Sequence, residues 1–200
     1  MLLAATCTRA DVIIDQSYTP ATPLPIPEGN PAAGVITTIN VSGLPATWLV
    51  SSIFSVDLDI SGGYNGDLYA YLKSPEGTVV TLLYQPGAAV DGGYGNPQPG
   101  LNITLTDSGA TSIQNVPDGS GTLTGTFAPA HPLAAFDNEV VDGGWSLYVA
   151  DVGSGGGTPS LVSWSLDIDA VPEPVNVALG IFSAVLLTGS VLRRGLRRSA

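Results

Sequence analysis

Polar and apolar residues alternate along several short stretches of this chain, which is the pattern of a strand with one buried face. The clearest stretches are residues 55–60 (SVDLDI), 145–152 (WSLYVADV) and 162–168 (VSWSLDI). Each places its apolar side chains on one face, because successive side chains of a strand point to opposite sides. A sheet with one apolar face needs a second layer to cover it. The pattern therefore predicts two packed sheets.

Four further stretches are rich in β-branched and aromatic residues, which favour strands. They are residues 67–72, 78–84, 101–106 and 122–127. The 25 glycines and 16 prolines of the chain supply clusters of turn formers between these stretches. Seven or eight short strands predict an all-β fold, a β-sandwich over residues 35–170.

Residues 11–34 precede this domain and carry five prolines after Ser17. Prolines hold the chain extended and remove backbone hydrogen-bond donors. We expect this segment to be poorly packed, and folding to begin near Gly34.

Residues 1–10 form an apolar stretch that ends in Thr8, Arg9 and Ala10. This is typical of the end of a secretory signal peptide, here a truncated one, and the alternative is a disordered N-terminus. Cys7 is the one cysteine of the sequence. An intrachain disulfide and a thiolate metal cluster are therefore excluded.

Residues 175–192 form an apolar run without a charged side chain. A helix of that length spans about 27 Å, which is enough to cross a bilayer. Arginines beside a membrane span stay on the cytoplasmic side, so the tail 193–200 predicts an exported body. The predicted stop-transfer residues are Arg193, Arg194, Arg197 and Arg198. The alternatives are a helix buried in the globular domain and a solvated basic tail.

Residues 171–174 (VPEP) stand directly before this run, and their two prolines predict an extended, accessible linker. The order of Pro-Glu-Pro, apolar span and arginine cluster over residues 171–200 resembles the sorting signal of PEP-CTERM proteins of Gram-negative bacteria. The resemblance implies an inner-membrane precursor that an exosortase, a membrane cysteine protease, recognises at Pro172, Glu173 and Pro174. It also implies release to the cell surface, often alongside exopolysaccharide production. The alternative is an ordinary single-span anchor.

Four further motifs follow one another along the body of the chain: Gly66-Asp67-Leu68, Ser74 to Thr78, Gly144 to Leu147 running to Asp151, and Trp164-Ser165-Leu166. In this order they resemble the P domain, the jelly-roll, galactose-binding-like sandwich that follows the catalytic domain of kexin-like and furin-like subtilases. A histidine that many family members carry before the first motif is absent, and a glycine-rich turn follows Asp151 in place of an acidic one. The resemblance implies a P-domain-like sandwich.

The charge of the body excludes one class of partner and suggests a cofactor. Between Asp11 and Ala170 the sequence holds sixteen acidic residues and one basic residue, Lys73. Such a body repels phosphate backbones, so nucleic acid is not a predicted partner. Calcium is a candidate cofactor because it takes carboxylate and carbonyl oxygens. The candidate ligands, whose alternative roles are solubility and loop capping, are Asp67, Asp137, Glu139, Asp142 and Asp151.

The sequence does not predict an enzyme. A subtilisin-like protease holds Asp, His and Ser on a larger α/β domain, and the one histidine here, His131, lies between two prolines in a predicted loop. An alternative is an envelope hydrolase that uses paired carboxylates. The carboxylates available for it are Asp57, Asp59, Asp137, Glu139 and Asp142.

Tyrosines flank the glycine-rich loops, and exposed aromatic rings beside hydrogen-bonding groups hold sugars or partner proteins. The predicted binding surface contains Tyr64, Tyr69, Tyr71 and Tyr94, with Tyr84 nearby in the sequence. Core packing and cross-strand pairing are the alternative explanation.

Together these patterns predict an exported, non-enzymatic protein of the cell surface or extracellular matrix. Its tail implies exosortase as processing partner, and its sandwich is expected to bind polysaccharide or protein. The alternative function is an accessory module that stabilises a separate subtilisin-like protease.

Overall fold

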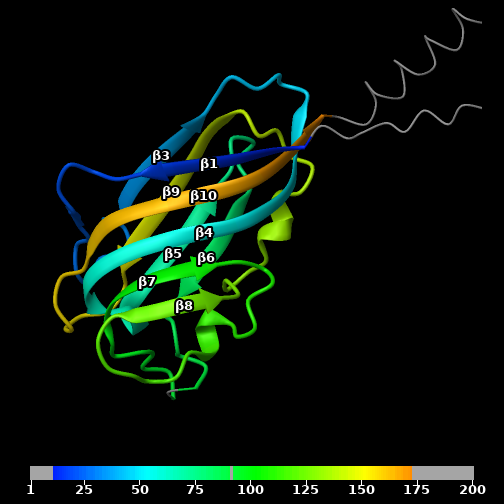
Figure 1. Cartoon of the computed structure of the whole chain (residues 1–200). Coiled ribbons are helices and arrows are strands. Elements are labelled where there is room, and N and C mark those ends of the chain that lie inside the picture. Colours follow the sequence, from blue (N-terminus) through cyan, green and yellow to red (C-terminus); the bar gives the residue numbers. More distant parts are fainter. Residues whose placement is uncertain (1–10, 91, 173–200) are drawn as a thin grey trace, which may run out of the picture.

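The computed structural model describes residues 11–90 and 92–172, which form a sandwich of two β-sheets (Figure 1). The six-stranded sheet has the order β1 (Val12–Tyr18), β10 (Ser160–Pro172), β4 (Trp48–Tyr64), β7 (Pro99–Leu105), β8 (Leu123–Phe127), with β2 (Leu24–Pro25) also paired to β10. The four-stranded sheet has the order β3 (Val35–Val41), β9 (Gly143–Asp151), β5 (Leu68–Lys73), β6 (Val79–Tyr84). The predicted all-β sandwich is confirmed.

All named strand pairs are antiparallel except β7 with β8, which run parallel. Three short 3-10 turns complete the described secondary structure: η1 (Asn65–Asp67), η2 (Ile113–Asn115) and η3 (Leu133–Phe136). Each of the seven stretches that the sequence pattern predicted as strands falls on one of the strands β4 to β10. The pattern missed β1, β2 and β3.

The core lies between the sheets and is filled from alternate strand positions. Val56, Leu58 and Ile60 of β4 are buried, while the residues between them are half-exposed. Trp145 and Trp164 are fully buried, and each indole N–H donates a hydrogen bond. Trp145 donates to the Val141 carbonyl at 3.0 Å, and Trp164 donates to the Thr37 hydroxyl at 2.9 Å. The second bond joins the two sheets, because Trp164 lies on β10 and Thr37 on β3.

The expectation that folding begins near Gly34 is wrong. β1 pairs with β10 along its whole length, from Val12 opposite Ala170 to Tyr18 opposite Trp164. Further along, Ile26 is fully buried, and its N–H bonds the Pro159 carbonyl at 2.9 Å. The prolines of this segment interrupt the chain between its two packed parts and do not keep it off the domain.

The linker expected at residues 171–174 also needs correction. Val171 and Pro172 are the last residues of β10, paired with Leu49 and Trp48. Val171 is buried, so it is not available as an accessible linker. Glu173 and Pro174, the apolar run 175–192 and the four tail arginines lie outside the described residues, as does the expected signal peptide 1–10. Within the described ranges there is no helix with the length and apolar character needed to span a bilayer.

Candidate functional site

Four tyrosines gather on the outer face of the four-stranded sheet. Tyr69 and Tyr71 stand at the outward positions of β5, between buried Leu68, Ala70 and Leu72. Strand pairing places Tyr71 opposite Tyr148 of β9 and Tyr69 opposite Tyr84 of β6. We call these four residues the tyrosine face: Tyr69, Tyr71, Tyr84 and Tyr148.

The rings of the tyrosine face are in mutual contact. Tyr71 and Tyr148 stack with centroids 4.9 Å apart and an interplanar angle of 18°. Tyr69 meets Tyr71, Tyr84 and Tyr148 edge-on, with centroid distances of 6.2, 6.2 and 6.4 Å. Tyr148 also donates its hydroxyl hydrogen to the Pro31 carbonyl, which fixes the ring from the side of the β2–β3 loop. The four rings therefore form one continuous aromatic surface.

A shallow cavity of about 410 Å³ borders this surface. Its side chains, besides Tyr69 and Tyr84, come from Thr81, Gln114, Ala130 and His131. Gln114 is held in place because its amide bonds both the N–H and the carbonyl of Tyr84. His131 lies in a loop, as predicted, and its backbone N–H bonds the Thr81 carbonyl at 2.9 Å. The cavity therefore offers amide, hydroxyl and imidazole groups next to aromatic rings.

The structure divides the predicted tyrosine set. Tyr69 and Tyr71 are brought together, but Tyr64 ends β4 in the other sheet, where its ring lies close to Gly156. Tyr94 is 87% exposed in the loop between β6 and β7. Sequence reasoning missed Tyr148, although it occupies an outward position of the alternating stretch 145–152. Tyr148 meets Tyr71 because β5 pairs with β9. This pairing joins strands that are far apart in the sequence, so a local pattern does not predict it.

The tyrosine face is neutral on an acidic molecule. Across β3, β5, β6 and β9 the one acidic residue is Asp151, whose side chain is buried, and the one basic residue is Lys73, exposed at the end of β5 two positions after Tyr71. The strands of the six-stranded sheet carry instead Asp15, Asp57, Asp59, Asp167 and Asp169. The outer surfaces of the two sheets therefore present different chemistry, one aromatic and one carboxylate-rich.

The five candidate calcium ligands lie in two separate places. Asp67 and Asp151 meet where β5 begins and β9 ends, since Leu68 pairs with Asp151. Asp142 directly precedes β9, and Asp137 and Glu139 follow η3, so these three lie toward the opposite end of that strand. In residues 11–90 and 92–172 no group of three or more His, Cys, Asp or Glu side chains is placed to hold a metal ion. The five do not form a single site.

Asp151 is the most constrained of these carboxylates. Its side chain is fully buried; Oδ1 accepts a hydrogen bond from the Gly153 N–H at 3.1 Å, and Oδ2 has no hydrogen-bond partner. Burial raises the pKa of Asp151 above its ordinary value, and the negative charges of Asp67 and Glu28 raise it further. The backbone N–H groups of Gly153 and Gly29 lower this pKa and offset part of the rise. Burial and Glu28 raise the pKa of Asp67 as well. The three carboxylates repel one another at neutral pH.

Asp151→Asn is expected to raise the melting temperature at pH 7 in chelator-containing buffer. A raised pKa means that the folded state holds this proton more tightly than the unfolded chain, so stability is highest below the ordinary pKa of 3.8 and is lost as pH rises through the raised value. The amide removes that loss while Oδ1 still accepts from Gly153. We expect a gain of about 2–4 °C and a flatter dependence of melting temperature on acidic pH.

The matched control for this variant is Asp118→Asn, which changes the same charge in an exposed loop. A melting temperature of Asp151→Asn below that of the wild type would contradict the repulsion argument. Comparison of wild type in millimolar calcium and in chelator tests the calcium hypothesis with the same assay, since binding to the folded state raises its stability.

Three further carboxylates, Asp107, Glu139 and Asp57, accept hydrogen bonds that give them structural roles. Asp107 caps η3 by accepting from the N–H groups of Leu133 (2.7 Å) and Ala134 (2.8 Å). Glu139 accepts from the Thr78 hydroxyl, and Asp57 accepts from Thr104 (2.6 Å) and Ser165 (2.8 Å). Burial and then the charge of Asp107 raise the pKa of Asp137. The five carboxylates considered for a hydrolase are thus divided between the middle of β4 and the η3–β9 segment.

A buried amide network, which sequence reasoning did not identify, supports the end of the domain near Asp67. Asn65 donates to the Asn96 side chain (3.2 Å) and the Gly100 carbonyl (2.9 Å), and Asn96 donates to the Gln98 side chain (3.1 Å). The backbones of Gly66 and Gly95 touch here, since a Cβ on Gly66 would lie 2.7 Å from the Gly95 carbonyl carbon and 2.7 Å from the Tyr94 carbonyl oxygen. This contact explains the glycine of the Gly66-Asp67-Leu68 motif.

The fold and its surfaces define the class of this molecule, a small two-sheet β-sandwich domain. A model of the proprotein convertase P-domain family matches residues 51–168, more than half of the sequence. The chain therefore belongs to the proprotein convertase P-domain family.

Two solved structures match this chain. A crystal structure of the serine protease of Aeromonas sobria in complex with its chaperone has a chain that matches with a TM-score of 0.50 and 16% identity, covering 82% of this chain and 27% of that one. A structure of the Aeromonas sobria serine protease matches with a TM-score of 0.48 and 18% identity, covering 84% and 28%. This chain thus spans little more than a quarter of those chains. A search of curated proteins gave no match.

Proposed function

We propose that this protein is an exported, non-enzymatic binding module that holds a neutral polysaccharide on its tyrosine face. The observation that carries the proposal is the continuous surface of four rings, built on three adjacent strands and free of carboxylates. Flat sugar faces pack against aromatic rings, and sugar hydroxyls need neutral donors and acceptors nearby. Gln114, His131 and Thr81 supply such groups at the edge of the rings.

The position of the face within the molecule favours a neutral occupant. The acidic body repels anionic polymers, and the carboxylates of the six-stranded sheet belong to the other outer surface. Strands are rigid supports, so the rings are already arranged before a ligand binds. Little ordering entropy is then lost on binding.

Tyr71→Ala and Tyr84→Ala are each expected to weaken binding of a neutral glucan about tenfold, because each removes a ring from the stacking surface. The measurement is affinity electrophoresis or calorimetry with the glucan, with circular dichroism to establish the fold. Tyr94→Ala is the matched control, since Tyr94 is exposed but lies off the face. Equal binding by wild type and Tyr71→Ala, or preference for anionic alginate, would contradict the proposal.

A second candidate function is that of an accessory module for a separate subtilisin-like serine protease. Membership of the proprotein convertase P-domain family favours it, since that domain is a non-catalytic accessory to the protease it accompanies. Co-purification with a catalytic domain, together with an increase in that domain's melting temperature, would support this function. Such a result, combined with no glucan binding, would assign the tyrosine face to a protein partner.

The route to the surface is part of the proposal and depends on residues 171–200. The sequence order of Pro-Glu-Pro, apolar run and arginines supports export with an inner-membrane precursor and processing by an exosortase. Because Val171 and Pro172 are paired within β10, we expect a cut to fall after Pro172. Mass spectrometry of the mature protein from its host measures the position of the cut, and we expect a C-terminus just beyond Pro172. An intact tail in every fraction would contradict processing and would indicate a permanent membrane anchor instead.

A further inference from the structure

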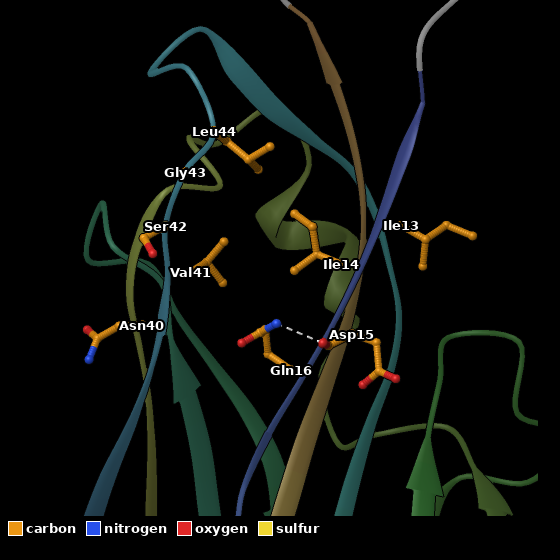
Figure 2. A pocket seen from close by; sticks show the side chains of 9 residues that line it. All are labelled: Ile13, Ile14, Asp15, Gln16, Asn40, Val41, Ser42, Gly43 and Leu44. Carbon is orange, nitrogen blue, oxygen red and sulfur yellow. Dashed lines mark hydrogen bonds between the residues drawn. The ribbon is translucent and has the colours of Figure 1, made fainter.

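β1 and β3 are the outermost strands of their two sheets and border the same open side of the sandwich. Between them lies a groove of about 600 Å³, lined by residues 13–16 of β1 and by residues 40–44 at the end of β3 (Figure 2). The side chains of Ile14 and Gln16 point into the groove, whereas Ile13 and Asp15 point away from it. The groove lies apart from the tyrosine face.

The outer edge of β1 is free to accept another strand. On one side β1 pairs with β10, and no strand in the described part of the chain pairs with its other side. The carbonyl of Asp15 faces that free side, where the Gln16 side-chain amide donates to it at 2.9 Å (Figure 2). The N–H and C=O groups of successive strand residues point to opposite edges, so Ile13 and Ser17 present theirs to the same side as Asp15.

This edge lacks most of the features that block strand addition. Such edges are protected by a bulge, a proline, a charged side chain, especially a lysine, or a very short strand, and of these β1 carries only the charge of Asp15. β1 keeps one continuous register over seven residues and contains neither proline nor lysine. Ile13, at its start, is 70% exposed. The edge is therefore regular, long enough to pair and apolar at one end.

The charges beside the edge specify the occupant. Asp15 stands directly opposite Asp167, and Ile13 stands opposite Asp169. Like charges in directly opposed positions destabilise a sheet, and a cation on a neighbouring strand offsets them. A second copy of this chain would add its own Asp15 to the cluster. A segment that carries Lys or Arg next to Asp15 would neutralise it.

We propose that the free edge of β1 is a strand-addition site for an extended segment of a partner protein. That segment has Lys or Arg at its outward positions, beside Asp15, and apolar side chains at its inward positions, over Ile14, Val41 and Leu44. Its backbone pairs with the peptide groups of Ile13, Asp15 and Ser17. Its side chains give the specificity and its backbone gives the affinity, as in other strand-addition complexes.

The test uses a fluorescent nine-residue peptide that alternates valine and lysine, with a valine–glutamate peptide as its counterpart. We expect the lysine peptide to bind by anisotropy and to slow hydrogen exchange at the amides of Ile13, Asp15 and Ser17. Asp15→Lys is expected to lower the affinity for the lysine peptide about tenfold, because the attraction between Asp15 and the peptide lysines becomes a repulsion between like charges. The fold is retained, since the same change removes the Asp15–Asp167 repulsion.

Asp118→Lys is the matched control, because it changes the net charge equally in a remote exposed loop. Asp118→Lys should lower the affinity for the lysine peptide less than about twofold. Equal losses in the two variants would reduce the effect to general charge attraction and overturn the proposal. Binding without protection of the three β1 amides would overturn it too, as would sedimentation showing a dimer of the free protein that Asp15→Lys strengthens.

Discussion

A chain shortened to begin at Gly34 is expected to be unfolded. The truncation removes β1, which covers the edge of β10 from Val12 to Tyr18, and it removes the buried side chain of Ile26. Truncating one buried isoleucine to alanine costs about 2–5 kcal/mol, and the lost strand adds to that. A typical domain is stable by about 5–15 kcal/mol, so this loss approaches the total.

Circular dichroism and tryptophan fluorescence measure the result. The comparison chain begins at Asp11 and keeps every described strand, so it should melt cooperatively. Ile26→Ala in the full chain isolates one contribution and should lower the melting temperature without abolishing the transition. Cooperative melting of the chain that begins at Gly34, close to that of the comparison chain, would show that the N-terminal segment is dispensable.

The second large effect is expected at Trp164, which connects the two sheets. Trp164→Ala removes a fully buried ring and is expected to cost about 3–5 kcal/mol. Trp164→Phe keeps most of the apolar contact but leaves the hydroxyl of Thr37, a residue only 6% exposed, without its donor. That change is expected to cost about 1–3 kcal/mol.

Denaturant unfolding of a double-mutant cycle separates packing from hydrogen bonding at this position. Thr37→Val removes the unpaired hydroxyl, so the pair Trp164→Phe with Thr37→Val should be more stable than the sum of the single changes predicts. Strict additivity of the two changes would show that the indole–hydroxyl bond contributes nothing. The cycle tests the one side-chain bond described above that joins β10 to β3.

The tyrosine face and the free edge of β1 suit two different kinds of ligand. The tyrosine face is fixed by strand pairing and ring contacts, which suits a preformed binding surface. The β1 edge offers unpaired peptide groups beside repelling carboxylates, which suits an extended cationic segment. Because they are separate in space, a variant on one surface should leave the other binding event unchanged.

Local patterns in the sequence were sufficient for the strands that alternate cleanly. The stretch at residues 145–152 was recognised because burial on one face imposes a period of two. The N-terminal strand was missed for a physical reason: Val12, Ile13 and Ile14 are consecutive apolar residues without alternation, and the prolines that follow suggested a loop. Their place at the edge of β10 depends on a partner about 150 residues away.

The candidate site shows the same limit. The sequence alone determined that the body is acidic, that it is built from β-strands, and that tyrosines are abundant near its turns. Only the tertiary structure decided which tyrosines meet, because Tyr148 and Tyr71 are joined by a pairing between distant strands. It likewise separated Asp67 and Asp151 from Asp142, which lies beyond the other end of β9. Composition fixes the chemistry that is available, and register fixes which groups can act together.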